Sequence, residues 1–362
     1  MEQDRKWQLE LEQYIKQGEP ERAEKSAAWQ NAIGLQAVDG LITSPYLMET
    51  ARAHIEGDID ISDAKQRILS YYEVRKDRQA IENGTMEADI VSVRIAEMLG
   101  EKTFQFSPAE LQSIHRRLFE GVFEHAGRFR TYNITKKEWV LNGDTVIYSS
   151  YSSIRETLDY DFAQEKQFSY EKISVPEAVR HIAKFASGIW QIHPFGEGNT
   201  RTTAVFVIKY LQTFGFRINH DVFAEHSWYF RNALVRANFN DFQKEIHAVT
   251  EYLDLFFENL LMGKHYELKN RYLHVDYTDN YAQSANEEDP KCKNCTLDCT
   301  LEELAVLRMI AENPRITQKN LAAAMGKSER TMKSRTVALQ EKGYIRRANG
   351  KRNGHWEVLV EV

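Results

Sequence analysis

The chain has 362 residues and a formal net charge of −6 at neutral pH, and 42% of its residues are hydrophobic. This length predicts two or three domains, and this composition is typical of a soluble globular protein. No stretch reaches the apolar length of a membrane span, and the charged N-terminus lacks the apolar core of a secretion signal, so we expect a cytoplasmic protein without a membrane partner.

Helical periodicity dominates residues 1–75, where Gly40 is the stop signal of the first clear helix. A second helix begins at Ser44-Pro45, and Ser62 is the expected N-cap of a third. We expect this segment to form a small helical domain.

The middle of the chain, residues 80–265, is also helical, with one exception. Ser107-Pro108 begins a capped amphipathic helix, and further helices precede and follow the loop described below. Between residues 137 and 149, two runs of alternating polarity flank Asn142-Gly143, which tolerates the positive φ of a tight turn. This pattern predicts a β-hairpin.

Residues 266–300 are polar and are expected to form a linker. The chain's three cysteines, Cys292, Cys295 and Cys299, are crowded here and cannot form a disulfide framework for a chain of this size. A zinc site usually has four ligands, and only these three cysteines are evident, with His274 as a candidate for the fourth. Free thiols are therefore favoured over a metal site.

Residues 301–362 contain three helical runs followed by two strand-like runs, the order of a winged helix-turn-helix. They hold 12 Lys and Arg against 7 Asp and Glu, whereas the rest of the chain is acidic. This basic surface favours DNA binding slightly over a docking or dimerisation role, with residues 328–343 as the recognition helix. The candidate DNA contacts are Arg330, Lys333, Arg335, Arg346 and Arg347.

The loop from His193 to Arg201 reads HPFGEGNTR and lies between two helices. The start of the second helix offers free backbone N–H groups to an anion, and Arg201 adds a guanidinium suited to phosphate. Glu197 is a hard oxygen ligand for Mg²⁺, and His193 can accept a proton from a hydroxyl. Each residue alone is more often a cap or turn residue, but the combination indicates phosphoryl or nucleotidyl transfer.

This loop resembles the signature of the Fic family, H-x-F-x-(D/E)-G-N-x-R-x-x-R, and residues 127–131 resemble the segment before the family's flap. The resemblance implies a mainly α fold: a Fic-type helical core with a β-hairpin flap, a small N-terminal helical domain and the C-terminal winged helix. It also implies a protein adenylyltransferase that moves AMP from ATP to a Ser, Thr or Tyr hydroxyl of a target protein, with His193 as base and Glu197 holding Mg²⁺.

The resemblance implies further site residues in the loop, on a later helix and in the flap. Phe195 is also expected to point inward, because its neighbours are polar, and strand addition at the flap would align the target. The implied nucleotide contacts are Phe195, Gly196, Gly198, Asn199, Thr200 and Arg201 in the loop and Tyr229 and Asn232 on a later helix, and the flap contacts are Val146, Ile147 and Tyr148.

Two positions depart from the family signature. Thr200 replaces the usual glycine or lysine, and Ala204 stands where the family has a second arginine that holds the γ-phosphate. The loop therefore predicts transfer, whereas Ala204 leaves the identity of the transferred group open. The alternatives are a Fic-fold transferase that uses UTP, GTP or CDP-choline, and a DNA-binding regulator with a degenerate Fic domain.

The N-terminal segment resembles the antitoxin-like partner of Fic toxins, whose inhibitory helix carries (S/T)-x-x-x-E-(G/N). Asp39 stands at the position of the inhibitory glutamate, and Leu35 replaces the serine or threonine. These residues could equally just end a helix. Our hypothesis is that the segment folds as an inhibitory domain that inhibits weakly or sterically, while the target and the oligomeric state, including a homodimer, stay open.

Overall fold

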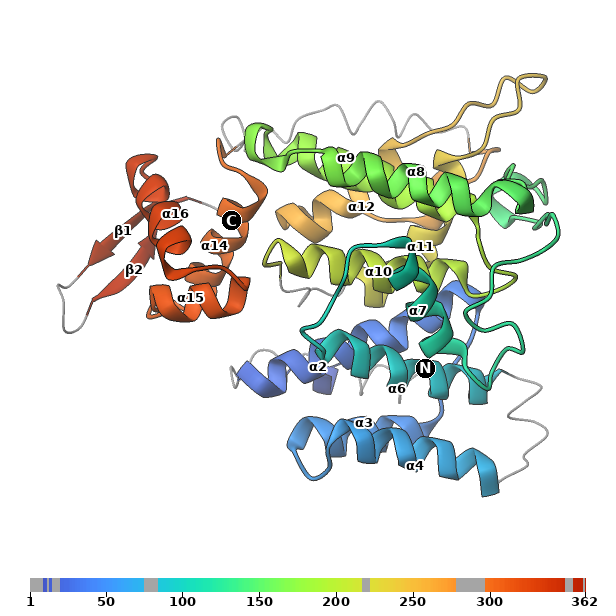
Figure 1. Cartoon of the computed structure of the whole chain (residues 1–362), viewed down its shortest axis with the longest axis horizontal. Coiled ribbons are helices and arrows are strands. Elements are labelled where there is room, and N and C mark those ends of the chain that lie inside the picture. Colours follow the sequence, from blue (N-terminus) through green and yellow to red (C-terminus); the bar gives the residue numbers. More distant parts are fainter. Residues whose placement is uncertain are drawn as a thin grey trace.

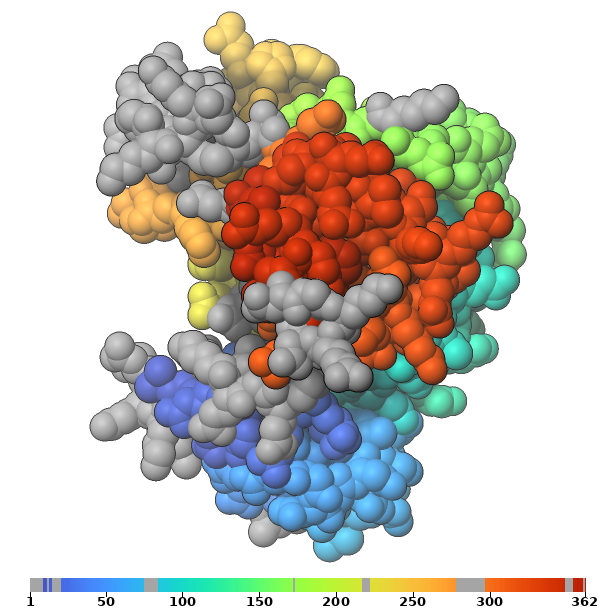
Figure 2. All heavy atoms as spheres, turned by 90° about the vertical axis from the view of Figure 1, so that its left-hand side faces the viewer, coloured from blue at the N-terminus to red at the C-terminus, as the bar shows by residue number. Residues whose placement is uncertain are grey.

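The computed structural model describes residues 9–11, 13–14, 20–74, 84–216, 222–277, 297–348, 354–360 and 362. A central body of helices has the blue N-terminal helices along its lower side and the red C-terminal unit at its left-hand end (Figure 1). Seen from that end, the C-terminal unit faces the viewer, with the light-blue N-terminal helices below it (Figure 2). Within the described residues, no helix combines the length and apolar character needed to cross a membrane. The predicted mainly α fold is confirmed.

The N-terminal helices follow the capping signals of the sequence with one exception. Gly40 ends the first helical stretch with φ of 69°, and the Ser44 hydroxyl accepts a hydrogen bond from Leu47 N. Ser62 is not the cap of the third helix: the Asp60 carboxylate accepts from Asp63 N instead, because the helix begins two residues earlier than predicted. These elements are α2 (Pro20–Gly34), η1 (Leu35–Asp39), α3 (Pro45–Glu56) and α4 (Ile61–Val74).

This segment is packed into the body rather than attached beside it. Helix α2 lies against α6 (Thr85–Gly100) and α11 (Val222–Ala237). A Cβ on Gly34 would lie 2.3 Å from the Ala224 backbone, so only glycine permits this approach of α2 to α11. The N-terminal helices therefore share the core of the central body.

Helix α10 (Asn199–Thr213) is central to the body, since every residue from Asn199 to Leu211 is buried. It begins at Asn199, so the last three residues of the HPFGEGNTR stretch already belong to the helix. Helix α9 precedes it, and the Glu177 carboxylate accepts from Ser174 N at the start of α9. The other elements around it are α7 (Pro108–Phe119), α8 (Ile154–Gln167), α9 (Val175–Ile192), α12 (Glu251–Met262) and the 3₁₀ turns η2 (Trp139–Leu141), η3 (Tyr151–Ser153), η4 (Tyr170–Lys172) and η5 (Asn270–Leu273).

The flap differs from the predicted β-hairpin. Asn142 and Gly143 do adopt positive φ, 56° and 88°, and the chain reverses there. However, η2 replaces the first strand, and residues 137–149 belong to no sheet. Glu138 N donates to Asp144 O, but η2 draws Val140 and Leu141 into the core and interrupts any ladder. The flap is thus a turn with extended arms.

The C-terminal unit confirms the predicted winged helix-turn-helix. Helix α16 has Ser328 as its N-cap, at the predicted start of the recognition helix. The antiparallel pair β1–β2 forms the wing, in the register Ile345 opposite Val358. Helix α14 contacts α9, which places the unit against one end of the body. Its elements are α14 (Leu301–Glu312), α15 (Gln318–Met325), α16 (Glu329–Glu341), β1 (Ile345–Ala348) and β2 (His355–Val358).

Candidate active site

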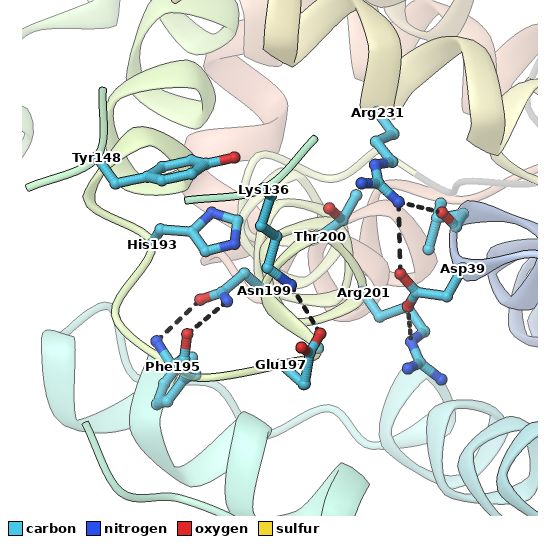
Figure 3. Close-up of polar contacts among 12 residues, drawn as sticks. Asp39, Lys136, Tyr148, His193, Phe195, Glu197, Asn199, Thr200, Arg201 and Arg231 are labelled. Atoms are coloured by element: carbon cyan, nitrogen blue, oxygen red, sulfur yellow. Dashed lines mark hydrogen bonds and ion pairs between the residues drawn. The ribbon is translucent and has the colours of Figure 1, made fainter. Parts of the chain in front are cut away.

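The loop between α9 and α10 is held by its own residues. His193 ends α9 with φ of 50°, and Gly198 precedes α10 with φ of 73°. The Asn199 side chain clasps the loop, because its Oδ1 accepts from Phe195 N at 3.0 Å and its Nδ2 donates to Phe195 O at 2.8 Å (Figure 3). A Cβ on Gly198 would lie 2.4 Å from the Phe119 ring, so the left-handed turn and the close packing both require glycine.

His115, a buried histidine of α7, packs against the loop and hydrogen-bonds to it. The His115 ring stacks on Phe195 with centroids 3.7 Å apart, and its Nδ1 accepts from Gly127 N at 2.8 Å. Its Nε2 must therefore carry the proton and donate to Glu197 O at 3.0 Å. Burial lowers the His115 pKa to about 4, so the ring stays neutral.

His193 is only 3% exposed and lies under Tyr148, with ring centroids 4.2 Å apart. Its Nδ1 lies 3.3 Å from Trp190 O, and a carbonyl can only accept, so Nδ1 carries the proton. Burial, and then the nearby Lys136 charge, hold the His193 pKa well below its usual range. The neutral ring thus has Nε2 as an unprotonated nitrogen.

Glu197 is the outward-facing carboxylate of the loop, with a 58% exposed side chain. Lys136, from the arm that leads into the flap, places Nζ 2.7 Å from Glu197 Oε2 (Figure 3). Mg²⁺ commonly takes one or two carboxylates and completes its shell with phosphate and water, so a single exposed carboxylate beside an anion site fits this ion. Lys136 occupies one of its oxygens in this state.

Arg201 is buried in the first turn of α10, where Gln36 and Glu87 accept hydrogen bonds from its guanidinium and Asp39 forms an ion pair with it. Its Nε lies 2.8 Å from Asp39 Oδ2, its Nη2 donates to Glu87 Oε1 at 2.5 Å, and its Nη1 donates to Gln36 Oε1 at 3.0 Å. The guanidinium also lies over the Phe119 ring, 4.8 Å from its centroid. Two carboxylates therefore gather around one cation at a helix N-terminus.

Arg231 reaches the same place from α11. Its Nη1 lies 3.7 Å from Asp39 Oδ1 and donates to Val38 O at 2.9 Å, while its Nη2 donates to both oxygens of the buried Glu138 carboxylate. Figure 3 shows Asp39 between Arg231 above and Arg201 below. No local pattern in the sequence marks Arg231, because its partners come from η1 and the flap.

Residues 105–211 match the Fic/DOC family, and residues 303–346 match a winged helix-turn-helix DNA-binding family. The chain carries a Fic/DOC domain. One curated relative is protein adenylyltransferase VbhT of Bartonella schoenbuchensis, 26% identical over 117 residues, which are 32% of this chain and 23% of that protein. The chain thus matches less than a quarter of that relative's length. A solved Fic family protein from Desulfovibrio desulfuricans G20 aligns over 88% of this chain and 97% of its own, with 13% identity and a TM-score of 0.33.

Several expected contacts of the Fic domain are not available to a ligand in this structure. Phe195 points inward as expected, but at 1% exposure its ring fixes the loop and cannot touch a nucleotide. Thr200 accepts a hydrogen bond from Trp190 Nε1 at 3.0 Å, which ties α10 to α9. Tyr229 and Asn232 are each 1% exposed, and Asn232 donates to Asn270, so α11 presents Arg231 to the site instead.

The three flap residues expected to contact the target differ in how exposed their side chains are. Val146 is 1% exposed and packs into the core, which excludes it from docking a target, and Tyr148 covers His193. Ile147 is 81% exposed and is the flap side chain that a target segment could contact.

The sequence alone did not indicate the role of Arg130. It lies within the segment that resembles the family's pre-flap motif, but its role is structural: it is 5% exposed and donates to the carbonyls of His193, Ile192, Tyr132 and Ser149. A buried arginine with only carbonyl partners fastens the flap to the end of α9.

Some of the candidate DNA contacts in the winged helix already have partners within the protein. Arg335 pairs with Glu302 at 3.2 Å, Arg346 pairs with Glu357 at 2.5 Å, and Arg347 lies over the Trp356 ring. The remaining candidates, Arg330 and Lys333, are exposed on α16.

The cysteine cluster falls mostly outside the described residues. Cys292 and Cys295 lie there, whereas Cys299 is buried, and burial raises the pKa of its thiol to about 12. No group of three or more His, Cys, Asp or Glu that could hold a metal occurs among the described residues.

Proposed function

We propose that this protein transfers AMP from ATP to a hydroxyl of a target protein, and that its N-terminal segment restrains the reaction. The observation that carries the proposal is the arrangement at Arg201, where a buried guanidinium in the first turn of α10 holds the carboxylates of Asp39 and Glu87. A cation and free N–H groups at a helix N-terminus bind phosphate by the same interactions. The name of VbhT, a protein adenylyltransferase, supports the choice of reaction.

His193 is the base in this proposal. The hydroxyl oxygen of the target attacks the α-phosphorus, the bond from that phosphorus to the bridging oxygen breaks, and pyrophosphate leaves. The proton of the hydroxyl passes to His193 Nε2, which is unprotonated because Nδ1 faces Trp190 O. Tyr148 has to move from its position over the ring for a target hydroxyl to approach.

Glu197 would hold Mg²⁺, which when bound lowers the charge of the triphosphate. The loop backbone, shaped by Asn199 and Gly198, receives the α- and β-phosphates, and Arg201 contacts them with its guanidinium. Lys136 has to leave Glu197 for the ion to bind, because it occupies one oxygen of that carboxylate.

Asp39 supplies the restraint. Its carboxylate takes a place at Arg201 that a phosphate would otherwise occupy, and it does so although the expected partner at position 204 is alanine. Asp39, at the inhibitory position, thus pairs with Arg201, the first arginine of the signature, and not with a residue at position 204. The contact joins η1 to α10, and the elements around it are packed into the core, so release needs η1 to move.

Labelling tests this function directly. Full-length protein, the Asp39→Ala variant and the Asp39→Ala/His193→Ala variant would be incubated with α-labelled ATP, GTP, UTP or CTP, or with phosphorus-labelled CDP-choline. We expect label from ATP on protein with Asp39→Ala and none when His193 is also replaced. Label only from another donor would replace AMP by that group. Absence of label from every donor would reject transfer and favour a DNA-binding regulator with a degenerate Fic domain.

A further inference from the structure

The Asp39 carboxylate has one oxygen toward each of two arginines. Oδ2 lies 2.8 Å from Arg201 Nε, and Oδ1 lies 3.7 Å from Arg231 Nη1. A carboxylate held between two guanidinium groups occupies the place that a phosphate group would take with the same partners. The site is therefore built for an anion with two cationic contacts, although only Arg201 belongs to the Fic loop.

The loop itself lacks a second arginine. Ala204 lies on α10 three residues after Arg201, is fully buried, and can contact no phosphate. Of the other cations around the loop in the described residues, Arg130 is committed to backbone carbonyls and Lys136 pairs with the carboxylate of Glu197. Arg231 is the arginine beside Arg201 that already faces an anion.

Arg231 is also oriented for such a contact. Its Nη2 is fixed by the buried Glu138 carboxylate, at 3.0 and 3.2 Å, and its guanidinium lies 5.3 Å from the Trp228 ring centroid. Both contacts of Nη1, with Val38 O and Asp39, come from η1. Movement of η1 therefore removes the partners of Nη1 and leaves its two protons directed at the vacated anion position.

We propose that Arg231 is the second phosphate-binding arginine of this site, supplied by α11 in place of the residue missing at 204. It contacts the terminal phosphate of a nucleoside triphosphate once η1 has moved, while Arg201 contacts the preceding phosphates. Glu138 is a positioning residue that orients the Arg231 guanidinium. The proposal rests on the proposed function, because it concerns the donor nucleotide of that reaction.

A purely structural role makes a different prediction. If Arg231 only ties α11 to Glu138 and η1, replacing it would weaken all nucleotides equally through loss of order. A phosphate contact instead affects ATP and spares ADP, since ADP lacks the terminal phosphate. The ratio of the two affinities separates these roles.

The experiment measures the dissociation constants of ATP and ADP by calorimetry on full-length Asp39→Ala protein, with and without Arg231→Ala. We expect the parent to prefer ATP by roughly tenfold, and Arg231→Ala to remove this preference while ADP binding changes less than about twofold. Arg231→Lys should keep part of the preference. Arg180→Ala, which removes an exposed arginine on α9, is the matched control and should leave the ratio unchanged.

Arg231→Ala leaves the buried Glu138 carboxylate without its partner, which can prevent folding. The double variant Arg231→Gln/Glu138→Gln avoids that charge and should show the same loss of preference. The proposal would be overturned if the Asp39→Ala protein bound ATP and ADP equally well. It would also be overturned if the ATP preference persisted in both Arg231→Ala and Arg231→Gln/Glu138→Gln.

The nucleotide-binding experiment and the labelling experiment can fail independently of each other. Loss of the ATP preference in a protein that attaches no label would reject AMP transfer and keep Arg231 as a phosphate contact. Label from ATP with an ATP preference that is insensitive to Arg231 would keep the transfer and reject Arg231.

Discussion

Asp39 Oδ2 lies 2.8 Å from Arg201 Nε, which joins the last residue of η1 to the first turn of α10. The Arg201 side chain is 2% exposed and that of Asp39 is 31% exposed, so little water screens the pair from the arginine side. The contact places a carboxylate of the N-terminal segment where the proposed reaction needs a phosphate.

Asp39→Ala should therefore raise autolabelling from ATP by roughly fivefold or more relative to wild type, because the competing carboxylate is gone. Asp58→Ala, which removes an exposed carboxylate after α3, is the control and should match wild type. Point variants are preferable to deletion of residues 1–75, since α2 buries Trp29 completely and its loss would expose the core. Equal labelling by wild type and Asp39→Ala would show that the contact does not restrain the reaction.

Lys136→Met should lower the Mg²⁺ concentration for half-maximal labelling in the Asp39→Ala background. Lys136 Nζ lies 2.7 Å from Glu197 Oε2 and competes with the ion for that carboxylate. Because the Glu197 side chain is 58% exposed, the pair is weak and we expect a change of only about twofold to fivefold. Lys137→Met, on the adjacent exposed residue, is the control. A higher Mg²⁺ requirement would mean that Lys136 assists the phosphates and does not obstruct the metal.

Arg130→Ala should destabilise the protein by about 3 kcal/mol and abolish labelling, because buried carbonyls around the flap lose their donor. Urea unfolding followed by circular dichroism measures the first effect. Arg128→Ala, on an exposed arginine two residues earlier, should unfold like wild type. Full stability together with lost labelling would place Arg130 in ligand binding rather than in fastening the flap.

Local signals predicted most of the fold. Ser44-Pro45 and Ser107-Pro108 begin helices because a hydroxyl acceptor and a fixed proline φ act within one turn, and the structure has both caps. The loop from His193 to Arg201 was recognisable for the same reason: its signature lies in a short contiguous stretch.

Apart from Asp39, which the resemblance to an inhibitory helix singled out, the partners of Arg201 were not predictable, because they are distant in sequence. Arg201 bonds to Gln36 and Glu87, which are 165 and 114 residues away. On α11, successive residues differ by about 100° around the helix, so the prediction placed Tyr229 and Asn232 at the site where the structure presents Arg231. Helix rotation is set by packing, here by the Gly34 contact with Ala224.

The winged helix should bind duplex DNA through few phosphate contacts. Arg330 and Lys333 are exposed on α16, whereas Arg335 and Arg346 pair with acidic residues. We expect full-length protein to bind random duplex at low salt, and Arg330→Ala/Lys333→Ala to reduce the slope of log affinity against log salt by about 2. Arg346→Ala should change the slope less, because Glu357 already balances it. Absence of binding at low salt would indicate a protein-docking role.

Acid should destabilise the protein through His115. Its pKa is about 4 in the folded state and ordinarily 6.5, so the unfolded chain takes up a proton first as pH falls. Stability from this group is thus complete above pH 6.5 and is lost between pH 6.5 and 4, by about 3 kcal/mol. Urea unfolding of wild type and His115→Phe across this range measures the loss.

His115→Phe keeps a ring against Phe195 but loses the bonds to Gly127 N and Glu197 O. It should be less stable than wild type at neutral pH, and the gap should narrow as the pH falls, because phenylalanine cannot take up the proton. His54, whose pKa burial also lowers to about 4, remains in both proteins and gives them a common slope. Parallel stability curves for the two proteins would show that His115 does not stay neutral in the folded state, and would remove the basis for its fixed hydrogen bond to the loop.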